Sequence, residues 1–95
     1  MKCFWVYIIT NKYNTVLYTG LTNDLSTRLW EHREKRNPQS FSAHYKLFKL
    51  IYFESFEWQI HAVRREKYIK GKTRQWKNEL IKKFNPEWLD LTNTI

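Results

Sequence analysis

Two tyrosines on two short apolar segments are the residues whose spacing first suggests chemistry. Tyr7 lies in CFWVYIIT and Tyr18 in TVLYTG, and the polar segment 11–14 between them has the composition of a turn. We therefore expect a hairpin with its loop centred on Lys12 and Tyr13, in which Tyr7 directly faces Tyr18 on one side of the sheet. Such a pair is either two ordinary core aromatics or two hydroxyl groups available for catalysis.

Arg28 and His32 are a second pair with useful spacing. Residues four apart lie on the same side of a helix, and an arginine fork together with a histidine N–H can contact one phosphate. An exposed polar helix face is the alternative for these two. Asn85 precedes Pro86, so its simplest role from the sequence is to end a helix.

Glu66 is a carboxylate in an apolar stripe. Trp58, Ala62 and Ile69 recur at helical spacing, and Glu66 falls between the last two. A buried carboxylate is costly unless it is paired or binds a metal. We therefore weigh an ion pair with an arginine against a ligand for Mg²⁺ or Mn²⁺, in an open site that keeps several waters.

The elements that must position these side chains follow from the apolar periodicity and the capping residues. We expect strands at 3–10, 15–20 and 48–54, with Gly20 closing the second strand and a loop at 37–44. We expect one helix of about a dozen residues from 25 and two more that end near 70 and 84. Their predicted N-caps are Asp24, Ser55 and Thr73, and Gly71 should end the second helix. The order β-β-α-β-α-α predicts an α+β fold with one sheet.

Length and composition indicate a single domain over residues 1–95. The 95 residues include five Trp, six Tyr and six Phe, which supply a core in a short chain. With Cys3 as its one cysteine, the chain can form no internal disulfide or cysteine-based zinc site. The apolar run at 3–9 is too short to span a membrane and carries no signal-peptide cleavage pattern. We expect a cytoplasmic protein.

The charge distribution favours a polyanionic partner. The net charge is +8, and nine Lys or Arg residues lie between positions 61 and 83 against two Glu. A solvated basic face and a membrane surface are alternatives, but the basic helices also carry apolar stripes that the core needs. The predicted nucleic-acid contacts are Arg64, Arg65, Lys67, Lys70, Lys72, Arg74 and Lys77.

The motifs together resemble one known family. WVY at 5–7 and YTG at 18–20 resemble the two halves of the motif that names the GIY-YIG nuclease superfamily. LTNDLSTRLWEH, REKYIKG and FNPEWLDL follow in the order found in its small stand-alone bacterial members. Trp5 stands where the first half-motif has glycine, and Thr19 replaces the isoleucine of the second half.

The resemblance implies both a fold and an activity. The fold is a small three-stranded antiparallel sheet flanked by helices, in agreement with the predicted element order. The activity is endonucleolytic hydrolysis of nucleic-acid phosphodiester bonds with one Mg²⁺ or Mn²⁺ ion, with DNA as the expected substrate and no small-molecule cofactor. A module of the same fold that binds nucleic acid without cutting it is the alternative.

The resemblance also implies residue roles. Tyr7 resembles the tyrosine that activates the attacking water, Tyr18 the one that positions water or phosphate, and Arg28 the arginine that stabilises charge on the phosphate. An isolated tyrosine has a pKa of about 10, so we expect Arg28 and a divalent ion to lower the cost of a Tyr7 phenolate. The remaining residues with implied roles are His32 in proton handling or phosphate contact, Glu66 as the sole carboxylate metal ligand, and Asn85 in structural support.

Overall fold

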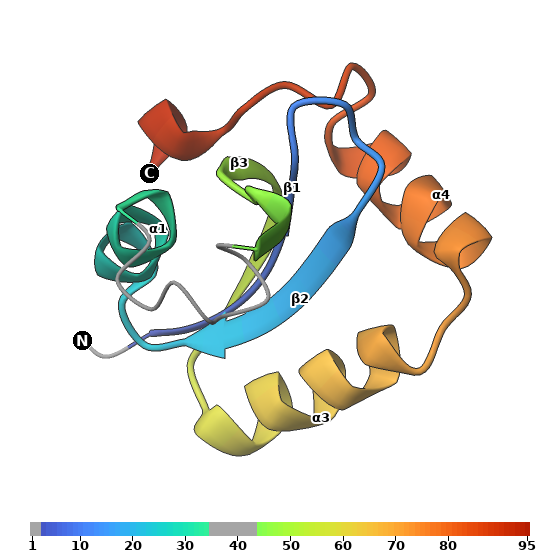
Figure 1. Ribbon diagram of the computed structural model, residues 1–95. Coiled ribbons are helices and arrows are strands. Elements are labelled where there is room, and N and C mark those ends of the chain that lie inside the picture. Colours follow the sequence, from blue (N-terminus) through green and yellow to red (C-terminus); the bar gives the residue numbers. More distant parts are fainter. Residues whose placement is uncertain (1–2, 35–43) are drawn as a thin grey trace.

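Three antiparallel strands form the central sheet of the protein (Figure 1). The computed structural model describes residues 3–34 and 44–95. Strand β1 (Phe4–Thr10) lies between β2 (Leu17–Thr22) and β3 (Lys49–Phe56), giving the order β2-β1-β3. The element order confirms the predicted α+β class and the three-stranded antiparallel sheet.

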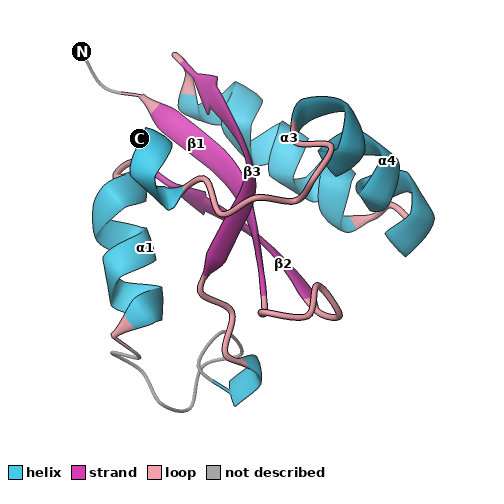
Figure 2. Cartoon of the chain, turned by 90° about the horizontal axis from the view of Figure 1, so that it is seen from above, coloured by secondary structure: helices cyan, strands magenta, loops and turns pink. Residues whose placement is uncertain are grey.

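Helices cover both faces of this sheet. α1 (Leu25–Arg33) lies on one side, and α3 (Gln59–Lys70) and α4 (Arg74–Phe84) lie on the other, as Figures 1 and 2 show. A short 3₁₀ helix, η1 (Thr92–Thr94), ends the chain near α1. Within the described residues, no helix has the length and apolar character needed to cross a membrane.

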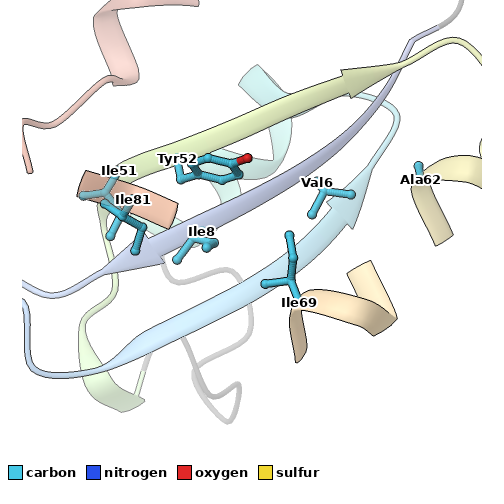
Figure 3. Close-up of a cluster of buried hydrophobic side chains, with 7 residues drawn as sticks. All are labelled: Val6, Ile8, Ile51, Tyr52, Ala62, Ile69 and Ile81. Atoms are coloured by element: carbon cyan, nitrogen blue, oxygen red, sulfur yellow. The ribbon is translucent and has the colours of Figure 1, made fainter. Parts of the chain in front are cut away.

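Alternation along β1 divides the core into two clusters. Val6 and Ile8 face α3 and α4 and pack with the residues drawn in Figure 3, whereas Tyr7 and Ile9 face α1 and pack with its residues Leu25 and Leu29. Tyr7 is thus a core residue by burial, with an exposed fraction of 1%. The central strand fixes its position from both sides, because β1 pairs with β2 and with β3.

The hairpin register differs from the predicted one by two residues. Tyr7 lies opposite Gly20, and Tyr18 lies opposite Ile9. The reason is Asn11, whose side-chain oxygen accepts hydrogen bonds from the backbone N–H groups of residues 15 and 16 and so lengthens the turn. A shift of two residues preserves the face on which each side chain points, so Tyr7 and Tyr18 still share one face as diagonal neighbours.

Most helix ends agree with the predictions, but α1 ends at Arg33 after nine residues and is shorter than the dozen or so expected. Asp24 and Thr73 cap α1 and α4 by accepting hydrogen bonds from backbone N–H groups, and Gly71 follows the last residue of α3. The prediction that Ser55 caps the second helix is wrong: Ser55 lies inside β3, and α3 begins at Gln59 without a side-chain cap. Of the predicted loop at 37–44, all but the last residue lies outside the described part of the chain.

Candidate active site

Tyr7, Tyr18 and His32 form a three-ring cluster where β1, β2 and the last turn of α1 meet. The Tyr7 hydroxyl lies 3.0 Å from His32 Nε2, within hydrogen-bond distance. The ring centroids of Tyr7 and Tyr18 are 6.4 Å apart, and that of His32 lies 5.9 Å from Tyr7 and 5.8 Å from Tyr18. Three of the predicted site residues, separated by up to 25 positions in the sequence, therefore lie close together.

Burial acts on the two hydrogen-bonded groups in opposite directions. It raises the pKa of Tyr7 well above its ordinary value, with the nearby Tyr18 and Glu66 adding to the effect and Arg28 opposing it. It lowers the pKa of His32, and the positive charge of Arg28 lowers that pKa further. At neutral pH both the phenol and the imidazole are therefore uncharged, and they share this hydrogen bond as neutral groups.

The expected contribution of Arg28 and a divalent ion to a Tyr7 phenolate has one part that the protein alone contains. Arg28 does lower the Tyr7 pKa, but without an ion the cost of burying the phenolate charge outweighs the attraction of the guanidinium group. His32 Nε2 lies within hydrogen-bond distance of the same hydroxyl and, in the tautomer protonated at Nδ1, can accept its proton. Proton transfer between these two residues needs no phenolate at rest.

Gly20 makes room for the Tyr7 ring. A Cβ atom at position 20 would lie 2.8 Å from Cε1 of Tyr7 and closer still to its Cζ and Oη. The prediction that Gly20 closes the second strand is wrong: this residue lies inside β2, directly opposite Tyr7. The YTG motif marks this glycine in the sequence. The structure shows why glycine is needed there: the backbone of β2 comes close to the Tyr7 ring.

Arg28 lies on the exposed side of α1, next to the cluster. Its side chain is about half exposed at 48%, and its Nε lies 3.7 Å from a carboxylate oxygen of Glu31 one turn later. It also lines a cavity of about 240 Å³, together with residues of β1, β2 and the start of α3. An exposed ion pair of this kind is weak, so the guanidinium group can exchange Glu31 for a phosphate.

Glu66 comes to the same region from α3. Its side chain is 18% exposed, and one of its carboxylate oxygens lies 3.5 Å from Lys70 Nζ. Glu66 thus forms an ion pair, as considered from the sequence, but its partner is a lysine and not an arginine. The i, i+4 spacing of Glu66 and Lys70 could have indicated this pair. The predicted stripe is correct at Ala62 and Ile69, which are fully buried, and wrong at Trp58, which is 62% exposed.

The donor set around Glu66 suits a hard ion that keeps most of its waters. Within the described ranges 3–34 and 44–95, no group of three or more His, Cys, Asp or Glu residues could hold a metal. A single carboxylate plus substrate phosphate is a usual way to bind Mg²⁺. An ion at Glu66 would have this one carboxylate, the substrate phosphate and water as ligands, and in the structure Lys70 is the ion-pair partner of Glu66.

Asn85 has a structural position next to α4. It is buried, its amide nitrogen donates to the carbonyls of Ile51 and Leu89, and its side-chain oxygen accepts from the N–H of Leu89. These bonds join the end of α4 to β3 and to the segment that follows Pro86. The geometry suits the structural role that the resemblance implies for it.

Replacing Asn85 with alanine should lower the free energy of unfolding by about 2 to 3 kcal/mol, because a buried carbonyl of Ile51 and two partly buried backbone groups of Leu89 lose their partner. Urea unfolding followed by tryptophan fluorescence measures this change. Asn93, in η1 and exposed, is the matched control and should change stability by less than about 0.5 kcal/mol. Equal effects of the two substitutions would contradict this role.

The predicted nucleic-acid contacts separate into two groups. Arg65 donates to both carboxylate oxygens of Glu54 at 3.0 and 3.1 Å, and Arg74 donates to the carbonyls of Asn14 and Thr15 in the hairpin turn. Both guanidinium groups are thus held within the fold. The Arg65 network, which also includes the Tyr52 hydroxyl bound to Glu54, was not foreseen from the sequence.

The remaining predicted contacts are lysines and one arginine on α3, on α4 and in the turn between these helices. Arg64 and Lys67 are exposed, and Lys77 is partly buried. Lys72 Nζ lies 4.3 Å from the ring centroid of Tyr68, and Lys70 Nζ lies 6.0 Å from that of Tyr18. The basic surface of α3 therefore reaches the three-ring cluster through Lys70.

Comparison with known proteins agrees with this geometry. A family model described as the GIY-YIG catalytic domain matches residues 3–85, which include every residue of the candidate site. The chain belongs to the GIY-YIG nuclease family. The match extends from the start of β1 to Asn85, and it confirms the resemblance seen in the motifs.

The GIY-YIG relatives are small bacterial proteins. A UPF0213 protein of Clostridium perfringens is 40% identical over 81% of each chain, and one of Pediococcus pentosaceus is 34% identical over 95% of this chain and 90% of its own. The solution structure of UPF0213 protein BH0048 from Bacillus halodurans shares the fold, with a TM-score of 0.60 at 24% identity over 95% of this chain and 94% of that one.

The two departures from the GIY-YIG motif lie on opposite faces of the sheet: Trp5 packs against the core cluster that contains Tyr7, and Thr19 lies on the other face. The Trp5 ring packs edge-on against Phe53, with centroids 5.9 Å apart. Thr19 is buried opposite Ile8, on the side of the sheet that faces α3 and α4. The bulky indole thus fills core space beside β3, and the tyrosines and Gly20 keep the arrangement described above.

Proposed function

We propose that this protein is a divalent-metal-dependent endonuclease that hydrolyses phosphodiester bonds in nucleic acid, with DNA as the expected substrate. The observation that carries the proposal is the hydrogen bond between the Tyr7 hydroxyl and His32 Nε2, beside Arg28 and Glu66. A buried phenol–imidazole pair next to an exposed guanidinium group has the parts of a general base and a phosphate clamp.

Tyr7 and His32 would act together on the attacking water. The water oxygen attacks phosphorus while its proton passes to Tyr7 Oη and the Tyr7 proton passes to His32 Nε2, so the tyrosine stays neutral. The bridging P–O bond breaks, and the leaving oxygen takes a proton from solvent. Tyr18, in contact with both rings, would orient the water or the phosphate.

Arg28 and Glu66 would handle the charge of the phosphate. The Arg28 guanidinium group can place two N–H donors on phosphate oxygens where negative charge develops. Glu66 is the residue that would hold Mg²⁺ or Mn²⁺, and the ion would supply further positive charge to the phosphate when bound. Nucleic acid would follow the basic surface of α3 and α4 through Arg64, Lys67, Lys70, Lys72 and Lys77.

A module that binds nucleic acid without cutting it is the second candidate. The Lys70–Glu66 ion pair favours it, because a paired carboxylate needs no metal to be stable. In that case the three-ring cluster would serve packing alone.

A cleavage panel separates the two candidates. Wild-type protein should cut at least one of supercoiled plasmid, branched DNA, single-stranded DNA and RNA when Mg²⁺ or Mn²⁺ is added and none in EDTA. Glu66→Gln should lose cleavage and keep binding, whereas Glu79→Gln, an exposed residue of α4, should behave as wild type.

Metal binding gives an independent test of Glu66. Titration calorimetry with Mn²⁺ should show a site in wild type that is absent from Glu66→Gln. Unchanged metal binding in that variant, or binding of DNA by wild type without cutting under any divalent ion, would support the binding module.

A further inference from the structure

A large cavity lies at the end of the sheet where the hairpin turns. Its volume is about 690 Å³, within the range of ligand sites. The turn of the hairpin, the last turn of α1, residues 45, 46, 48 and 49, and Asp90 line it, and we call it the hairpin-end pocket. In Figure 2 the hairpin turn, the end of α1 and the start of β3 lie at this same end of the molecule.

The hairpin-end pocket is strongly basic. Lys12, Arg33, Lys46 and Lys49 line it, against the single carboxylate of Asp90. Asp90 lies 3.4 Å from Arg33, and Lys49 donates to the Asn14 side chain, so these three groups have partners in the fold. Lys12 and Lys46 are exposed and form no ion pair with any residue that the structure describes. Two cations are therefore available to an anion.

Two tyrosines give the same pocket a flat apolar surface. Tyr13 is 74% exposed and Tyr45 is 44% exposed, although both are large aromatic side chains. The Lys12 ammonium lies 5.7 Å from the centroid of the Tyr13 ring, so charge and aromatic surface occur together. Aromatic rings beside cations in a groove are the usual means of holding an unpaired nucleotide: the base stacks and the phosphate is neutralised.

The pocket is connected to the candidate active site through two elements. His32 belongs to the active-site cluster, and its neighbour Arg33 lines the pocket. Along β1, Asn11 in the pocket is four residues from Tyr7, which is about 13 Å of extended chain. That length corresponds to about four nucleotides at the duplex spacing of roughly 3.4 Å, and to fewer in a stretched strand.

We propose that the hairpin-end pocket binds an unpaired nucleotide of the substrate a few nucleotides from the bond that is cut, an inference that rests on the proposed function. The base stacks on Tyr13 or Tyr45, and the flanking phosphates contact Lys12 and Lys46. The preferred substrate then contains single-stranded nucleotides beside the cut, as at a flap, a gap or a branch. A continuous duplex offers the pocket only phosphates, because its bases are stacked on each other.

Fluorescence anisotropy in EDTA measures binding without cleavage. The probes are a single-stranded oligodeoxythymidine and a blunt duplex of equal length. Removing both rings, in Tyr13→Ala/Tyr45→Ala, should weaken single-strand binding by about fivefold to a hundredfold and change duplex binding by less than about twofold. Tyr13→Phe/Tyr45→Phe keeps the rings and should bind as wild type does.

The two lysines are tested by charge reversal. Lys12→Glu/Lys46→Glu should reduce the slope of log Kd against log salt for the single strand by about 1.4 or more, because two phosphate contacts are lost. The matched control is Lys82→Glu/Lys83→Glu, which makes the same charge change at exposed positions of α4. Thermal melts confirm that each variant is folded.

Each outcome decides between the pocket and the alternatives. Equal weakening by the two charge reversals, or equal loss of duplex and single-strand binding in the alanine variant, would mean that only diffuse charge attracts nucleic acid and that the pocket is no site. Normal cleavage of a flap or gapped substrate by both pocket variants would contradict the inference and leave the nuclease proposal standing. Failure of the proposed function would instead appear as wild-type protein that never cuts.

Discussion

Replacing Gly20 with alanine should destabilise the protein by about 1 to 3 kcal/mol and remove most of its nuclease activity. The added Cβ would overlap the ring of Tyr7, and neither partner has an easy way to move. The backbone of Gly20 is held by the pairing of β2 with β1, and the Tyr7 side chain is buried among the residues packed on the central strand. The ring must therefore turn away from His32, which breaks the hydrogen bond on which the proposed chemistry depends.

Gly71→Ala is the matched control for this substitution. A Cβ at position 71 would meet only backbone oxygens at 3.6 and 3.7 Å, which is ordinary contact, and its φ of −79° suits any residue. We expect Gly71→Ala to leave the midpoint of urea unfolding and the cleavage rate nearly unchanged.

A double-mutant cycle assigns the cause. If overlap with the ring destabilises Gly20→Ala, then Gly20→Ala/Tyr7→Ala should be more stable than the sum of the two single effects, by about 1 kcal/mol or more. Additive effects would show that alanine harms the strand itself and does not act through Tyr7.

Replacing Tyr7 with phenylalanine should lower the cleavage rate by about 10²- to 10⁴-fold, the usual effect of losing a general acid–base group. The ring still fills its place in the core, so the free energy of unfolding should fall by only about 1 kcal/mol for the lost hydrogen bond. Single-turnover cleavage with saturating protein isolates the chemical step. Tyr68→Phe, an exposed residue of α3, is the control and should cut at the wild-type rate.

The pH dependence distinguishes two roles for the Tyr7 hydroxyl. If His32 accepts the proton, it must be neutral, and its pKa lies below the ordinary 6.5 because of burial and the charge of Arg28. The rate should then be level through neutral pH and fall on acidification below that pKa as the imidazole becomes protonated. A rate that keeps rising above pH 10 would show instead that Tyr7 acts as a phenolate, against the raised pKa of its buried hydroxyl.

The sequence predicts helix ends well because the hydrogen bonds that form them join residues close together in the chain. Asp24, Thr73 and Gly71 fix helix ends through bonds to residues a few positions away, and the sequence alone predicts them. The hairpin register was wrong because one side chain, Asn11, holds two backbone N–H groups of the next strand and lengthens the turn. Serine is a residue type that commonly caps helices, but at position 55 the pairing of β3 with β1 continues as far as Phe56.

The sequence predicts the candidate site only in part, because some of its features depend on contacts between distant elements. Tyr7 and Tyr18 share a face in either register, because a shift of two residues preserves the alternation. The space that Gly20 leaves for the Tyr7 ring, and the burial that raises the Tyr7 pKa, depend on packing between elements that no local pattern encodes. Arg65 and Arg74 look like surface charges in the sequence, and only the folded chain shows that Glu54 and the hairpin turn hold them.

The place of Tyr7 in the middle strand has a consequence for the motions of the site. Amide groups of β1 are bonded to strands on both sides, so in hydrogen exchange they should be among the last to open, near the free energy of global unfolding. The hydroxyl to which we assign a catalytic role is therefore tied to the most rigid part of the domain. Adjustment to substrates of different shape must come from its partners on α1 and α3, which can shift while the strand stays fixed.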